Sequence, residues 1–175
     1  MQEFYLETIP EFLQGAEGKN RIYSPLNVYM ALAMLAETTA GETQKQILDV
    51  LHTDTIESLR DKAKTLWNAN YCDDGTVTSL LASSVWLSDS VQYKKEVLET
   101  LADTYYASSF SGEMGSEQFD KSLQEWLNAQ TGDLLKEQSS KLGFDPITVF
   151  ALATTVNFQA KWMDEFNPSR QRHDS

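Results

Sequence analysis

The sequence has very few of the residues that build covalent or metal-bound sites. Among 175 residues it has one cysteine, Cys72, and two histidines, His52 and His173. A single cysteine excludes a disulfide within the chain, and this set is too small for a convincing zinc site. The glycine motif that cradles phosphates is also absent. We therefore expect no bound metal and no cofactor.

Catalytic residues are equally hard to find. The ending His173-Asp174-Ser175 contains the residue types of a hydrolase triad. Three adjacent residues cannot reproduce the geometry in which a base lies between a nucleophile and a carboxylate. The sequence therefore predicts that the protein is not an enzyme.

Positive charge is scarce. The chain has 14 Lys and Arg against 26 Asp and Glu, for a net charge of −12. Such a surface repels nucleic-acid phosphates and anionic lipid heads, which argues against both as partners. The longest apolar run, residues 28–36, is too short to cross a bilayer. The N-terminal segment MQEFYLETIPEF lacks the basic head and apolar centre of a signal peptide, so the sequence does not assign a compartment.

What is present is an ordinary globular composition, with 41% hydrophobic and 23% charged residues. Residues 2–16 suggest a short helix. In residues 20–48 we expect a short strand, then a helix that begins at Ser24 and Pro25, and a second helix after Gly41. Because residues 28–35 are apolar on almost every side, the first of these two helices is expected to be buried.

Later segments alternate between helical and strand patterns. Helical spacing marks residues 55–68, 97–105 and 119–127, and strand patterns mark residues 76–88, 107–110 and 148–162. This order predicts an α+β fold.

The last strand has two different faces. One carries bulky residues such as Phe150, Leu152 and Phe158, and the opposite face is small at Ala151 and Ala153. We expect the bulky face to lie toward a core and a helix to lie close across the small face.

Four segments together resemble the serpin family, in the family's order. They are YSPLNVYMALAMLAETTAGETQKQIL, TVTSLLASSVWLS, SLQEWLNAQTGDLLKE and VFALATTVNFQAKWMDEF. They look like the buried helix beneath the large sheet A, the second strand of that sheet, the helix across it and its third strand. The resemblance implies the serpin fold, with helices A to F and strands 1 to 3 of sheet A. Residues 1–175 would form the N-terminal part of one serpin domain, which is incomplete without the C-terminal half.

The resemblance also implies which residues surround the point where a serpin sheet opens. Ser24 matches the first shutter serine. Asn27 stands where a second serine is usual, and Thr154 where the third strand normally has an asparagine. We expect Asn27 and Thr154 to be neighbours, with the Asn27 amide replacing the one that the strand lacks. Trp162 matches the tryptophan of the breach, where the loop first enters the sheet. Without the family, Ser24 is an ordinary helix cap, Thr154 a strand threonine and Trp162 a core residue.

The function implied is inhibition of a serine protease, possibly a cysteine protease. A cleaved reactive loop would trap the acyl-enzyme and insert into sheet A. That loop is not in this chain, so we expect the chain alone to be an inactive fragment that can self-associate through uncovered apolar surface. The alternative is a non-inhibitory or truncated serpin-like binding or structural protein. The family favours an extracellular location. A heparin site is not expected, because Arg60, Lys62 and Lys64 are interspersed with Glu57 and Asp61.

Overall fold

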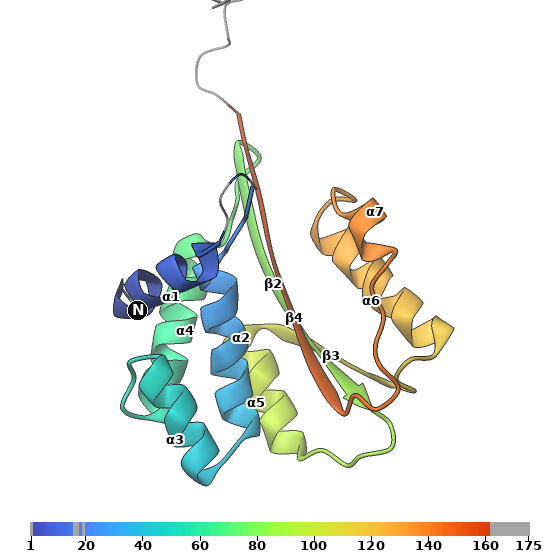
Figure 1. Ribbon diagram of the computed structural model, residues 1–175, viewed down its shortest axis with the longest axis horizontal. Coiled ribbons are helices and arrows are strands. Elements are labelled where there is room, and N and C mark those ends of the chain that lie inside the picture. The colour runs from blue at the N-terminus through green and yellow to red at the C-terminus, as the bar shows by residue number, and fades with distance from the viewer. Residues whose placement is uncertain (1, 16–17, 19, 162–175) are drawn as a thin grey trace, which may run out of the picture.

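The computed structural model describes residues 2–15, 18 and 20–161, arranged as helices on both faces of one sheet (Figure 1). The elements are α1 Gln2–Leu13, α2 Pro25–Thr38, α3 Gly41–Val50, α4 Ile56–Asn70, β1 Cys72–Asp73, β2 Val77–Ser88, α5 Lys95–Tyr105, β3 Ala107–Gly112, α6 Glu117–Gln130, α7 Lys136–Ser139 and β4 Phe150–Ala160. Helices α1 to α5 lie on one side of the sheet and α6 and α7 on the other. The α+β prediction is confirmed.

Strand β2 is the centre of the sheet. It pairs antiparallel with β4 along one edge, from Val77 opposite Ala160 to Leu87 opposite Phe150. Its other edge pairs in parallel with β3 and, near its start, antiparallel with β1. Within the described residues no strand pairs with the outer edge of β4.

Helix α2 begins where the sequence predicts. The Ser24 hydroxyl accepts a hydrogen bond from the Asn27 amide at 3.4 Å, and Pro25 takes the first helical position, where its missing N–H costs nothing. The strand expected before the helix is wrong: residues 20–24 are irregular, because no strand lies beside them in the described residues. The expected burial of this helix is confirmed for most of its length, since Tyr29, Met30, Ala33 and Met34 are buried, while Val28 in the first turn is exposed.

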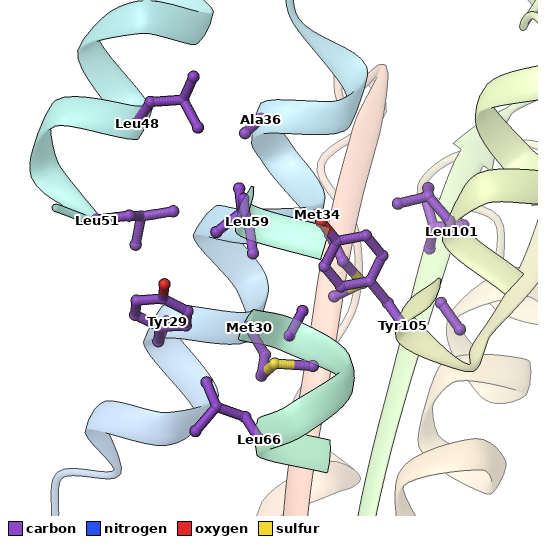
Figure 2. Packing of buried hydrophobic residues seen from close by; sticks show 14 of the residues in the cluster. Tyr29, Met30, Met34, Ala36, Leu48, Leu51, Leu59, Leu66, Leu101 and Tyr105 are labelled. Atoms are coloured by element: carbon purple, nitrogen blue, oxygen red, sulfur yellow. The ribbon is translucent and has the colours of Figure 1, made fainter. Parts of the chain in front are cut away.

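The larger core lies between the sheet and the helices α1 to α5. Figure 2 shows Tyr29 and Met34 of α2 near Leu51, Leu59 of α4 and Tyr105 of α5. All five side chains are fully buried. Burial of this kind stabilises a fold by about 1.5–3 kcal/mol per large apolar side chain. Helix α2 is thereby held between the sheet and the outer helices.

A smaller core joins α6 to the opposite face of the sheet. The ring of Trp86 stacks on Phe110 with centroids 4.2 Å apart and meets Phe119 edge-on at 5.3 Å. Its indole N–H donates to the Ser84 hydroxyl at 2.8 Å. Ala151 and Ala153 pack against the same cluster, as expected for the small face of this strand.

Candidate functional site

The candidate site lies beneath β4, where the strand crosses the start of α2. The Thr154 hydroxyl donates to the main-chain carbonyl of Asn27 at 3.4 Å. Asn27 in turn donates its main-chain amide to the Ser24 hydroxyl. Ser24, Asn27 and Thr154 therefore form one hydrogen-bonded chain, and all three are half-buried.

The bond between α2 and β4 uses the main chain of Asn27 rather than its side chain. The two residues are neighbours, as expected. The contact does not involve the Asn27 side-chain amide. That this amide takes the place of the asparagine amide usual in the strand therefore stays a prediction. Because a hydroxyl can rotate to a new acceptor, the Thr154 contact can break and re-form without moving the backbone.

Ser83 is a member of this site that sequence reasoning missed. It lies directly opposite Thr154 in the register of β2 and β4, and it is buried. It shares a face of β2 with Val85 and Leu87, which belong to the larger core. The period-two pattern of residues 76–88 places Ser83 on the same face as Val85 and Leu87. Its neighbour across the strands depends on the register of β2 and β4, which the pattern does not give.

The outer part of β4 presents apolar surface. Phe158 is 65% exposed and Val156 is 37% exposed. Both lie toward the end of the strand that follows Thr154. Together with the edge that has no partner in the described residues, they give β4 the features of a strand that accepts a neighbour. Trp162, the predicted breach residue, lies outside the described residues.

The other face of β4 carries polar groups beneath the end of α6. Thr155 is buried, and its hydroxyl has no hydrogen-bond partner within the described residues. Asn157 is also buried, and its side-chain amide lies close to Gly132, just after α6. A Cβ at Gly132 would be 3.8 Å from the amide nitrogen. An unpartnered buried hydroxyl costs about 1–3 kcal/mol, so Thr155 is a destabilising feature of this face of β4.

An ion pair with a buried carboxylate joins the helices that support α2. Arg60 of α4 binds the Glu37 carboxylate through two nitrogens, at 2.9 and 2.8 Å, and the Tyr105 hydroxyl donates to the same carboxylate at 2.9 Å. The side chain of Glu37 is only 4% exposed. Burial, reinforced by the Glu37 charge, raises the pKa of Tyr105, and hydrogen bonding to Glu37 raises the pKa of Arg60. This network, which the sequence did not predict, joins α2, α4 and α5.

The basic residues considered for heparin are partly used within the fold. Arg60 binds Glu37, and the Lys62 ammonium donates to the His52 carbonyl and the Thr53 hydroxyl. In residues 2–15, 18 and 20–161 no group of three His, Cys, Asp or Glu side chains is placed to hold a metal ion. None of the helices that the structure describes has the length and apolar character needed to span a bilayer.

Comparison with known proteins identifies relatives for the whole chain. The family model described as "Serpin (serine protease inhibitor)" matches residues 1–175. Mouse serpin B11 is 26% identical over 182 residues, which cover 94% of this chain and 46% of that protein. The chain thus spans about half the length of the curated relatives it matches.

Solved structures share the fold at lower identity. Ovalbumin from emu superposes with a TM-score of 0.84 at 20% identity, covering 95% of this chain and 47% of that one. Human thyroxine-binding globulin in complex with thyroxine has a TM-score of 0.82 at 17% identity, covering 95% and 46%. Both likenesses concern the fold alone.

Proposed function

Because the chain belongs to the serpin family, we propose that it forms the sheet half of a protease inhibitor whose own cleaved loop becomes a strand beside β4. The observation that carries this proposal is the outer edge of β4. It has no partner strand in the described residues, and it lies over the hydroxyl contact between Thr154 and Asn27.

Strand addition needs main-chain donors and acceptors that are free to pair and a support that can rearrange. The edge of β4 provides the first requirement. The second is supported by the Thr154 hydroxyl, whose hydrogen bond can move to another acceptor as the strand shifts, and by the small side chains of Ser24 and Ser83 beside it. Leucine or phenylalanine at these positions would have to repack instead, at a cost of about 1–3 kcal/mol.

The chemistry of the proposal belongs to the target protease. Its serine oxygen attacks a loop carbonyl, the amine product leaves, and an ester joins the two proteins. Insertion of the loop beside β4 then displaces the ester from the groups that activate water, so hydrolysis stops. A protease with a cysteine nucleophile would form a thioester in the same way.

We place this activity in a polypeptide that also has the reactive loop. None of the segments that resemble the serpin family in these 175 residues corresponds to the reactive loop. On their own they are expected to form no complex with a protease.

The test uses the complete gene product and a panel of serine and cysteine proteases. We expect at least one protease to yield a band at the summed mass that survives SDS and is absent when the protease nucleophile is replaced by alanine. Cleavage by every protease of the panel without such a band would overturn the proposal.

A second candidate is a non-inhibitory binding protein. It is supported by the thyroxine complex of a protein with the same fold, and by Asn27 and Thr154, which differ from the residues that the family usually has. This candidate predicts that the complete product is cleaved as a simple substrate and gains no heat stability afterwards. An inhibitor that gains a strand should unfold at a higher temperature after cleavage.

A further inference from the structure

A hollow of about 540 Å³ lies at the lower end of the molecule, away from the Thr154 site. Figure 1 shows the end of α2, the loop after β2 and the start of α5 meeting at this end. The wall is largely apolar and is formed by Leu87 of β2, Phe150 of β4, and Val97 and Leu98 of α5. Hollows of this size that are lined by apolar side chains from several elements are typical of small-molecule sites.

Hydrogen bonds hold the walls of the hollow in place. The Tyr93 hydroxyl donates to the Val149 carbonyl at 2.6 Å and so fixes the loop after β2 to the start of β4. On the opposite wall, the Gln44 amide donates to the carbonyls of Ala36 and Thr39, at 2.9 and 3.1 Å. A site whose walls are already fixed loses little conformational entropy when a ligand binds.

The lining of the hollow carries one positive charge that is not balanced by a paired carboxylate in the described residues. Lys94, at the start of α5, is the basic residue of the lining, and it forms no ion pair within the described part of the chain. Glu37 also contributes to the wall, but its carboxylate is held by Arg60 and Tyr105. The negative charge of Glu37 is therefore balanced, and the ammonium of Lys94 remains.

We propose that this hollow binds a small amphipathic carboxylate, with the apolar part among Leu87, Leu98 and Phe150 and the carboxylate beside Lys94. The anionic head follows from charge complementarity with the Lys94 ammonium, the basic group of the lining. The volume suits a medium-chain fatty acid or an aromatic acid of similar size.

The probe for the test is decanoate, titrated into the chain calorimetrically below its micelle concentration, with decanol as the neutral analogue. We expect saturable binding of one decanoate per chain. Lys94→Gln should weaken decanoate by about fivefold to tenfold, the effect of one charged hydrogen bond at a partly exposed position, and change decanol by less than about twofold. Leu98→Trp should fill the hollow and weaken both ligands by at least about tenfold.

Lys95→Gln is the matched control. Lys95 is the next residue, but it pairs with Glu99 at 2.8 Å and does not line the hollow. It should change decanoate affinity by less than about twofold, which also measures the effect of overall charge. If Leu98→Trp unfolds the chain, the comparison of Lys94→Gln with Lys95→Gln still tests whether decanoate binds beside Lys94.

Three results would overturn the proposal. The first is no saturable decanoate binding by the unmodified chain. The second is equal weakening by Lys94→Gln and Lys95→Gln. The third is full binding by a folded Leu98→Trp variant, which would place the ligand elsewhere, such as on the exposed apolar surface of β4.

Discussion

At the scale of single residues, two adjacent threonines of β4 have opposite surroundings. Thr154 faces α2 and donates to the Asn27 carbonyl, whereas Thr155 faces α6 and its hydroxyl is buried without a partner in the described residues. The same substitution at the two positions should therefore have effects of opposite sign. Each variant is the control for the other, because β-propensity and strand position are nearly matched.

Thr154→Val should lower the free energy of unfolding by about 0.5–1.5 kcal/mol, because it removes the hydrogen bond to α2. Urea unfolding followed by circular dichroism measures this change. If the variant is as stable as the unmodified chain, the contact between α2 and β4 makes no net contribution.

Thr155→Val should raise the free energy of unfolding by about 1 kcal/mol, since it replaces a buried hydroxyl that lacks a partner with a methyl group of similar volume. The same unfolding experiment measures it. A loss of stability comparable to that of Thr154→Val would show that the Thr155 hydroxyl is satisfied, by water for example.

At the scale of elements, the ion pair of Glu37 and Arg60 connects α2 to α4 across the larger core. Arg60→Met should lower the free energy of unfolding by about 2–3 kcal/mol. The reason is that Glu37 would remain buried without its cation, and the value allows for the partial exposure of Arg60, whose side chain is 38% exposed.

Arg60→Lys is the matched variant for this pair. It keeps the charge but loses the two-nitrogen geometry, so it should cost about 1 kcal/mol. Thermal unfolding of both variants gives the comparison. Equal losses would mean that shape at position 60, not the charge, determines the stability of this contact.

Much of the element structure could be predicted from the sequence, because its signals are local. Ser24 and Pro25 fix the start of α2, and the alternation in residues 148–162 fixes the two faces of β4. The ion pair of Glu37 and Arg60 and the register that sets Ser83 opposite Thr154 could not be predicted, because each joins residues far apart in the sequence. Residues 20–24 do not form the expected strand for a related reason. A strand needs hydrogen bonds to a neighbouring strand, and a local sequence pattern does not show whether such a neighbour exists.

At the scale of the whole molecule, the exposed apolar residues of β4 should favour association of chains. Phe158→Lys adds charge to this strand and should shift a self-associated population toward monomer. Sedimentation velocity over a range of concentrations measures this shift. The control is Ile147→Lys, which replaces an exposed residue just before β4. A fully monomeric unmodified chain would contradict the expectation.

The central claim is that β4 gains a neighbouring strand during inhibition. Hydrogen exchange on the complete gene product, before and after cleavage by its target protease, tests this most directly. We predict that amides of residues 150–160 become more protected after cleavage, while those of β3, on the opposite edge of the sheet, stay unchanged. Unchanged exchange in β4 after cleavage would contradict the account.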